Sequence, residues 1–517
     1  MAETAVETTP TGTRTPTGTP ASACAPAGET IPTEVSFRGE RSGTAPLTWG
    51  QRAIWHAIRR TAPNDHYFNI GRVLPLADRG RPATVAATLD ALARLIERHE
   101  ALRTRLVPAA AGGEPAQCLT DTGTLPVTIA PATGLPEAAA EAEALLGRMS
   151  ATRFDYPAEW PLRAALVTVG DRVTHAVLVL CHLAADGHAA EVLVRDLRLL
   201  VRRGSAGRPP ATTPLDLARD QHAERGRRRG AAALAHWEAG FRAAPPTMFP
   251  EPCAEPRSPR FWTGRIVSPA LARAVAAVAA AHGVSGSTVL LTASAALVAA
   301  GEGHRTAAVM PIVGNRTAEA LRDLVSTLSQ DGLFILDLAA AERKHDDGDG
   351  AGDGDGAARF TDLLPAAHRA ALRAYRAAVY DPVEWDALGE RLHTEYGSEV
   401  HPYCCFNDMR LVERPVSEGP RPAPQEPAEE LTEARRRTAF GFPATQDRVA
   451  CRYCLHITEE GDALAVSLTA DTAYLPPEAI RAHLYAMEEL IVTSAAGGPP
   501  LVAELRALLE TAEGDRP

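Results

Sequence analysis

Lysine is almost absent from the sequence, aromatic side chains are few, and there is no excess of positive charge. Lys344 is the only lysine among 53 basic residues, and aromatic residues make up 5% of the 517 residues. With 64 acidic residues the formal net charge is −11, which argues against a protein that binds nucleic acid. We attribute the missing lysine to a preference for GC-rich codons, since alanine is abundant, and draw no mechanism from it.

Long apolar runs and an export signal are also missing. No apolar run approaches the roughly 20 residues that a membrane-spanning helix needs, so no membrane partner is expected. Residues 1–32 are polar and contain no apolar segment of the kind that a signal peptide carries. We therefore expect a cytoplasmic protein whose eight cysteines are reduced thiols.

The length and composition predict two halves with flexible segments around them. The chain exceeds one ordinary core, and strands alternate with helices along it, which predicts an α/β fold. We predict a disordered leader (1–34), a first half (35–213), a connecting helix and linker (214–260), a second half (261–496), a disordered Asp- and Gly-rich insertion within it (345–357) and a tail (497–517). Within the connecting segment, residues 215–241 indicate one basic helix.

The stretch from Cys181 to Gly187 is the most informative part of the chain. An almost uninterrupted apolar run, 173–180, precedes it, and apolar residues recur with helical spacing over 189–200. This pattern predicts a buried strand that feeds a helix, so the stretch lies at the strand end. There His182 can hold or accept a proton near neutral pH, and Gly187 permits a tight turn into the helix.

Five segments resemble motifs of the condensation domains of nonribosomal peptide synthetases. They follow the order of the family over roughly residues 44–495: Pro46–Trp55, Arg98–Leu106, Phe154–Arg163, Cys181–Gly187 and Pro311–Leu338. The fourth is similar to the HHxxxDG motif, with Cys181 in place of the first histidine and His182 as the second. In the fifth, the usual Asn-Thr is missing from Ser329–Leu338, which affects the expected geometry of the tunnel.

The resemblance implies an architecture and a substrate. It implies two chloramphenicol-acetyltransferase-like halves that form a V-shaped pseudo-dimer, with His182 inside a central tunnel. A carrier protein would present a thioester on its phosphopantetheine arm from one side, and an amine or hydroxyl acceptor would enter from the other. No bound cofactor is implied.

The resemblance also assigns roles to residues of the loop. His182 would either deprotonate the acceptor or orient it through a hydrogen bond, and the backbone N–H of Gly187 could stabilise the developing oxyanion. Asp186 would be structural, paired with Arg316. Cys181 is small and tolerates burial, so it can replace a packing histidine.

Two further residues are candidates for substrate binding. Asn407 resembles an asparagine in a late strand of the family, near the tunnel, although it could equally cap the end of a strand. His188 follows the loop directly and is a second candidate.

A metal site is a weaker interpretation of the cysteines. Cys451 and Cys454, with Cys404, Cys405 and His401 upstream, could be drawn as a zinc site. However, residues 449–457 look like a strand, in which positions three apart face opposite sides. The Asp- and Gly-rich insertion lacks the glutamate that closes an EF-hand loop. We therefore expect no metal.

Three classes of function remain. The first is a free-standing condensation enzyme, because the chain lacks a Gly-Gly-x-Ser attachment motif and an adenylate-forming signature. Such an enzyme would meet acyl or peptidyl carrier proteins in trans, take a small-molecule acceptor and act as a monomer. The alternatives are an acyltransferase that uses acyl-CoA, and a non-catalytic module that recruits a partner.

Overall fold

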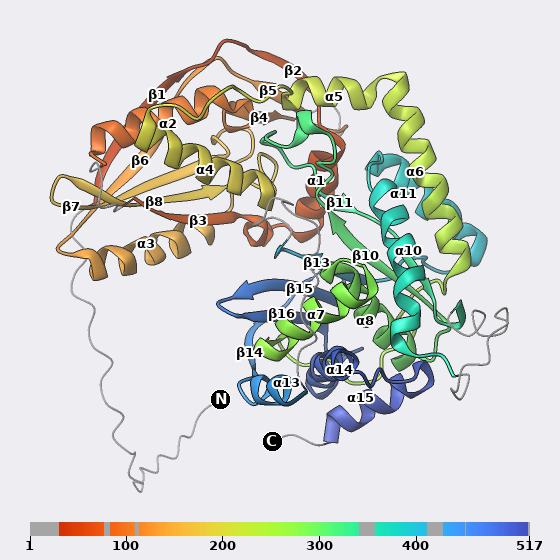
Figure 1. Ribbon diagram of the computed structural model, residues 1–517. Helices are drawn as coiled ribbons and strands as arrows, with labels where there is room; N and C mark the ends of the chain where they lie inside the picture. Colours follow the sequence, from red (N-terminus) through yellow and green to blue (C-terminus); the bar gives the residue numbers. More distant parts are fainter. Residues whose placement is uncertain are drawn as a thin grey trace, which may run out of the picture.

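The computed structural model describes residues 30–76, 83–108, 113–340, 357–410, 428–449 and 451–514. These residues form two α/β lobes, each built on its own large sheet, with the first lobe at the upper left of Figure 1 and the second at the lower right. The α/β fold class is therefore confirmed. Residues 1–29 of the predicted leader and 345–356 of the predicted insertion lie outside the described residues.

A five-stranded sheet with helices on both faces forms the first lobe. Its strands, in spatial order, are β1 (Ile31–Arg38), β6 (Thr122–Ala132), β7 (Leu162–Val169), β8 (Arg172–Leu180) and β3 (Ile70–Pro75), and its helices are α2 (Val85–Arg98), α3 (Leu135–Ser150) and α4 (Gly187–Arg203). Leu166 and Leu178 pack with α2 and α4, whereas Val167 and Val177 pack with α3. Because both faces are covered, β7 and β8 are almost wholly apolar, as the sequence predicted for 173–180.

A small antiparallel sheet and one helix lie on the side of the first lobe that meets the second. They are β2 (Gly43–Pro46), β5 (Ala116–Leu119), β4 (Thr104–Val107) and α1 (Trp49–Thr61). A reciprocal cap starts α1, since the Thr48 hydroxyl accepts from the Gln51 N–H and the Gln51 side chain accepts from the Thr48 N–H. The Gln51 amide also donates to the carbonyl of Leu183 at 3.2 Å, which ties α1 to the loop after β8.

An eight-stranded sheet forms the second lobe. Its strands, in spatial order, are β11 (Gln330–Asp331), β10 (Thr306–Val313), β13 (Cys404–Asp408), β15 (Tyr453–Glu460), β16 (Ala463–Asp471), β9 (Phe261–Ser268) and β14 (Ala439–Gln446), and β12 (Phe334–Asp337) also pairs with β10. Its helices are α7 (Pro269–His282), α8 (Gly286–Gly301), α10 (Leu364–Arg376), α11 (Pro382–Tyr396), α13 (Ala428–Arg435), α14 (Pro477–Ala495) and α15 (Leu505–Gly514). Phe406, Leu455 and Leu468 join the apolar core with α7, α8 and α14. The opposite face of the sheet turns toward the first lobe (Figure 1).

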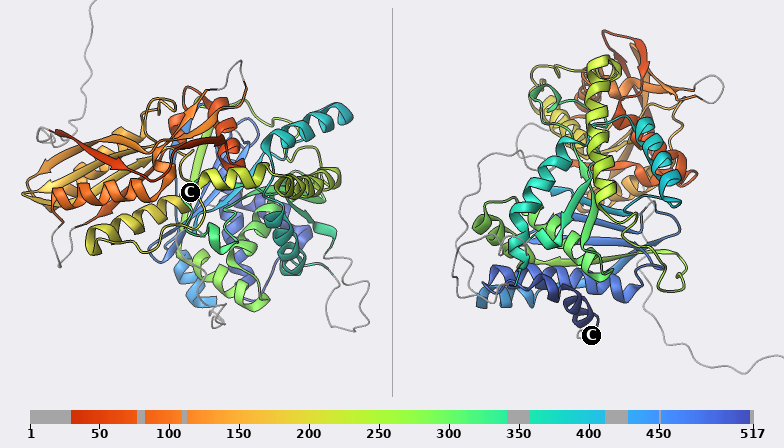
Figure 2. Two further views of the ribbon diagram at one scale, coloured as in Figure 1. Left: turned by 90° about the horizontal axis from the view of Figure 1, so that it is seen from above. Right: turned by 90° about the vertical axis from the view of Figure 1, so that its right-hand side faces the viewer.

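Two helices cross from the first lobe to the second, in yellow-green in Figure 2. They are α5 (Pro214–His222) and α6 (Glu224–Ala243), so the single helix predicted over 215–241 is wrong. The helices are interrupted at Ala223, whose backbone is extended. Trp237 and Phe241 of α6 belong to the core of the second lobe. The predicted linker 214–260 is therefore partly a piece of that lobe.

Both predicted outer boundaries need correction. β1 begins at Ile31, inside the predicted leader, and pairs with β6 along its length. It is an edge strand whose first residues are exposed, so its sequence shows little apolar signal. At the other end, Leu505 and Leu509 of α15 pack into the core of the second lobe, so the predicted tail contains an ordered helix.

Within the described residues, no single helix combines the length and apolar composition needed to cross a membrane. The consecutive helices α7 and α8 reach that composition only as a pair, and they are bent by 103°. Nearly every residue of α8 is buried in the second lobe, which is the usual reason for such an apolar helix in a folded core.

Candidate active site

The loop between β8 and α4 carries the predicted site. β8 ends at Leu180 and α4 begins at Gly187, as the change of apolar spacing predicted. Cys181 turns the chain, since its carbonyl accepts from the N–H of Ala184 at 2.9 Å. The Cys181 side chain is buried, and burial raises the pKa of its thiol to about 12. The thiol therefore stays protonated and acts as a packing group.

His182 meets the second lobe through Thr327, in the loop before β11. Its Nδ1 atom lies 3.4 Å from the Thr327 Oγ1, and the Thr327 hydroxyl donates to the His182 backbone carbonyl. A hydroxyl has one hydrogen, so its oxygen accepts from the ring while its hydrogen goes to the carbonyl. The proton of a neutral ring then sits on Nδ1, which leaves Nε2 as the basic nitrogen.

The environment keeps the ring neutral. Burial lowers the pKa of His182 from its ordinary value, and a backbone hydrogen bond and the charge of Asp186 offset this only in part. A histidine with a lowered pKa is unprotonated at neutral pH and can accept a proton.

Asp186 joins the two lobes behind the loop. Arg316 donates to both of its carboxylate oxygens, at 2.7 and 2.8 Å, so the predicted pair is present. The backbone N–H groups of Leu328 and Ser329 donate to the same carboxylate at 3.0 and 3.2 Å. The carboxylate also caps α4, accepting from the N–H of Ala189 at 2.9 Å.

These contacts keep Asp186 ionised although it is buried. Burial alone would raise the pKa of the carboxyl, and the charge and hydrogen bonds of Arg316 outweigh it, so the pKa lies below its ordinary value. Leu328 and Ser329 directly follow Thr327. Asp186 therefore holds the segment of the second lobe that touches His182.

Gly187 and His188 open α4. The Gly187 N–H belongs to the first turn, in which backbone donors have no partner inside the helix. The His188 Nε2 lies 2.9 Å from the backbone carbonyl of Arg322, in the second lobe. This contact engages one ring nitrogen with the protein, and a role of either residue toward substrate stays a prediction.

Asn407 lies on the sheet face that turns toward the first lobe. Along β13, Phe406 and Asp408 are buried on the helix side, so Asn407 points to the other face by strand alternation. Its neighbour in the parallel register of β15 is His456. This placement is compatible with substrate contact, which stays a prediction.

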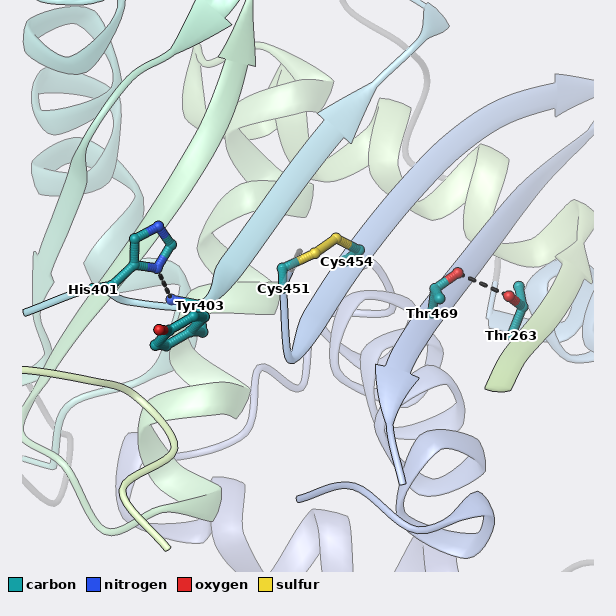
Figure 3. The surroundings of a disulfide bond; sticks show 6 residues. All are labelled: Thr263, His401, Tyr403, Cys451, Cys454 and Thr469. Atoms are coloured by element: carbon teal, nitrogen blue, oxygen red, sulfur yellow. Dashed lines mark hydrogen bonds between the residues drawn. A yellow bond between two sulfur atoms is a disulfide. The ribbon is translucent and has the colours of Figure 1, made fainter. Parts of the chain in front are cut away.

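Cys451 and Cys454 form a disulfide, so the expectation of reduced thiols is wrong for this pair (Figure 3). The predicted strand over 449–457 begins only at Tyr453, and Cys451 lies in the turn before it. The side chains therefore do not alternate across one strand, and the Cα atoms are 6.2 Å apart, within reach of a disulfide. Among the described residues, no group of three or more His, Cys, Asp or Glu side chains is arranged to hold a metal ion.

The sequence did not single out Gln51 or Thr327. Gln51 lies in the first resembling segment and Thr327 in the fifth, so both segments were recognised while these residues were not. Thr327 acts on His182 across 145 positions of sequence, and no local spacing signals such a contact. The resemblance located the segments, and the structure shows which side chains of each reach the loop.

Comparison with known families and proteins agrees with this geometry. Residues 41–380 match the condensation domain family. Phosphinothricin tripeptide synthetase PhsC of Streptomyces viridochromogenes is 31% identical over 301 residues, which are 56% of this chain and 27% of the synthetase. The chain thus spans about a quarter of the length of this curated relative.

Solved structures share the fold at low identity. SgcC5 from Streptomyces globisporus, in complex with a naphthyl ethanediol and sucrose, is 20% identical with a TM-score of 0.60, covering 88% of this chain and 99% of that one. A mutant of the starter condensation domain of the rhizomide synthetase RzmA, in complex with C8-CoA, is 16% identical with a TM-score of 0.61, covering 89% of this chain and 96% of that one. These matches establish the two-lobed condensation-domain fold.

Proposed function

Because the chain belongs to the condensation domain family, whose members are acyltransferases that form amide or ester bonds, we propose that it joins an acyl or aminoacyl thioester to an amine or hydroxyl acceptor. Condensation domains act on substrates bound to the phosphopantetheine arm of carrier proteins in natural-product biosynthesis. In this proposal the chain is free-standing, meets its carrier proteins in trans as a monomer and takes a small-molecule acceptor.

The observation that carries the proposal is the contact of His182 with Thr327. It keeps the ring proton on Nδ1, and the lowered pKa of His182 keeps Nε2 free to accept the hydrogen of the acceptor. A scaffold would need neither feature. A general base positioned in this way typically contributes ~10²–10⁴-fold to the rate.

The reaction needs little more than alignment and the transfer of one proton. The acceptor nitrogen or oxygen attacks the thioester carbonyl, the new C–N or C–O bond forms, and the C–S bond breaks. The acceptor proton passes to Nε2 of His182 and then to the departing sulfur. Holding both substrates in attack geometry can supply ~7–11 kcal/mol. The N–H of Gly187 is assigned to the developing oxyanion.

Acyl-CoA is the second candidate donor, because a domain of the same fold binds C8-CoA. CoA and carrier proteins end in the same phosphopantetheine thiol, so the chemistry at His182 would be unchanged. An assay with one acyl group on a loaded carrier protein and on CoA separates the two donors. A carrier preference of at least tenfold in kcat/KM supports the proposal, and the reverse preference contradicts it.

His182→Ala tests the catalytic role. We expect product formation to fall ~10²–10⁴-fold with little change in the melting temperature, because the side chain is half-buried, its contact with the Thr327 hydroxyl is long at 3.4 Å, and it meets the Phe68 ring only edge to face. Where substrates are unknown, a deletion strain complemented with each variant at matched expression shows whether the missing metabolite returns.

His175→Ala is the matched control, since His175 lies within β8, seven residues before His182 along the chain. It should restore the metabolite fully. If His182→Ala restores it equally, the catalytic interpretation fails and a recruiting role is indicated.

A further inference from the structure

Asp331 carries a carboxyl group that the mechanism above does not use. Asp331 is half-buried at the end of β11, and among the described residues no hydrogen bond or ion pair engages its carboxyl group. A carboxylate that is removed from water without a partner is unfavourable, and a functional role would explain why this one is present.

The register of β11 places this carboxyl between the lobes. Gln330 is buried, and its side-chain amide donates to the Tyr380 carbonyl at 2.9 Å, so it points into the second lobe. Asp331 follows it and pairs with Ile312 of β10, so its side chain leaves the opposite face of the strand. The charge of Arg60, from α1 of the first lobe, acts on it.

Asp331 is also close to the candidate active site along the chain. It lies four residues beyond Thr327, which touches His182, and four residues span at most about 14 Å. Asp186 fixes the two residues after Thr327 through their backbone N–H groups. The carboxyl therefore has a defined position on the segment of the second lobe that contacts His182 through Thr327.

The electrostatic surroundings of Asp331 indicate which kind of group would bind its carboxyl. Burial raises the pKa of Asp331 to about 6, and the charge of Arg60 opposes this only in part. Near neutral pH the carboxyl is thus mostly ionised without a partner. A ligand cation would supply the missing charge, and hydrogen bonds between charged groups are stronger than those between neutral ones.

We propose that Asp331 binds a cationic group, an ammonium or a guanidinium, of a substrate whose reacting atom lies at His182. The inference rests on the proposed function, because it takes the space between the lobes as the substrate site. The cation can belong to the acceptor or to the acyl chain. In both cases Asp331 is a specificity-determining residue that leaves the chemistry to His182.

Ligand pairs that differ in one charge test the inference. 6-Aminohexan-1-ol against hexan-1-ol represents the acceptor, and the 6-aminohexanoyl against the hexanoyl thioester of N-acetylcysteamine represents the acyl chain. Calorimetric binding in the His182→Ala background removes turnover from the measurement. We expect the ligand with the additional charge to bind more tightly in one arm, and Asp331→Asn to weaken it ~10- to 100-fold while its uncharged partner is unaffected.

The arm that shows the difference identifies which substrate carries the cation. If Asp331→Asn changes neither arm, or if the charged ligands have no advantage in the parent protein, the inference is wrong. If His182→Ala abolishes product formation, only the inference on Asp331 fails and the proposed function stands. If product formation survives His182→Ala, the proposed function fails instead.

A stability measurement excludes a purely structural role. The raised pKa means that the ionised carboxyl destabilises the folded protein, so Asp331→Asn should melt at the same or a higher temperature at pH 8. A lower melting temperature would make Asp331 a structural residue and overturn the proposal.

Discussion

Among the charged residues that join the lobes, two sets differ in burial and in the pH at which they act. The Asp186–Arg316 pair is nearly inaccessible, with side chains 4% and 6% exposed. The second set surrounds His56 of α1, whose Nδ1 lies 3.1 Å from Asp386 of α11 and whose Nε2 lies 3.2 Å from Glu114, just before β5. In that set the exposure rises to 43% at Asp386.

The His56 set also contains a direct ion pair between the lobes. Arg52, one turn before His56, donates to Asp381 at 2.7 Å and lies 3.7 Å from Glu114. Arg59 lies 3.9 Å from Glu114. Carboxylates from two other elements therefore face the cationic side of α1, and water reaches most of these groups.

The difference in burial determines whether a contact fixes the position of a residue or changes with salt and pH. A buried pair contributes little net stability, but removal of one partner leaves an uncompensated charge, so Asp186 and Arg316 depend on each other. Exposed pairs contribute up to about 1 kcal/mol each and respond to salt and pH. The Asp186–Arg316 pair fixes the loop of His182. The stability that the His56 set contributes is expected to change with salt and pH.

The largest expected effect is that of Asp186→Ala. Arg316 would lose its carboxylate, and the N–H groups of Leu328, Ser329 and Ala189 would lose their acceptor, so we expect a loss of about 3–5 kcal/mol in the free energy of unfolding and little soluble protein. Soluble yield and urea unfolding measure this.

Asp216→Ala is the comparison for that variant, because it breaks an exposed pair with Arg41. It should cost no more than about 1 kcal/mol. If Asp186→Ala and Asp216→Ala had equal free energies of unfolding, burial would not determine how much each contact contributes.

The Asp186–Arg316 pair was predictable from sequence, and the His56 set was not. Asp186 and Arg316 lie in segments that resemble family motifs, so their partnership came with the resemblance. His56, Glu114 and Asp386 come from three elements whose meeting depends on how the lobes pack, and no periodicity encodes that.

The same distinction applies to the rest of the fold and site. The strand, loop and helix around His182 follow from apolar spacing, which local sequence carries. The break at Ala223 and the position of Cys451 before β15 are not visible in the apolar spacing of the sequence, and element boundaries are the least predictable part of a fold. Thr327 and Asp331 were not predicted, because their importance depends on residues that are distant in the sequence.

Arg52→Met should have an intermediate effect. It removes the ion pair to Asp381 but keeps the aliphatic stem, and Asp381 still caps α11 by accepting from the N–H of Val383 at 3.1 Å. We expect a loss of about 1 kcal/mol, at the upper end for accessible pairs, and a smaller loss at high salt. Urea unfolding at low and at high ionic strength measures both; a salt-independent loss above that of Asp186→Ala would reverse the order proposed here.

His56→Gln should have the smallest effect, and only within one range of pH. The hydrogen bond to Asp386 and the charge of Glu114 raise the pKa of His56 above its ordinary value of 6.5, although burial opposes them. The stability that His56 adds is then fully present below pH 6.5 and is lost as the pH rises through the higher pKa of the folded state.

The pH dependence of Asp186 has the opposite sign, which makes pH the sharpest way to separate the two contacts. Its pKa is lowered, so its contribution is present above the ordinary value of 3.8 and is lost as the pH falls through the lower folded-state pKa. Melting of the parent protein and of His56→Gln should therefore differ at pH 5.5 and converge by pH 8.5, while the Asp186 contact is intact throughout this range. A difference that grows toward pH 8.5 would mean that the neutral ring, rather than its charge, holds α1 against α11.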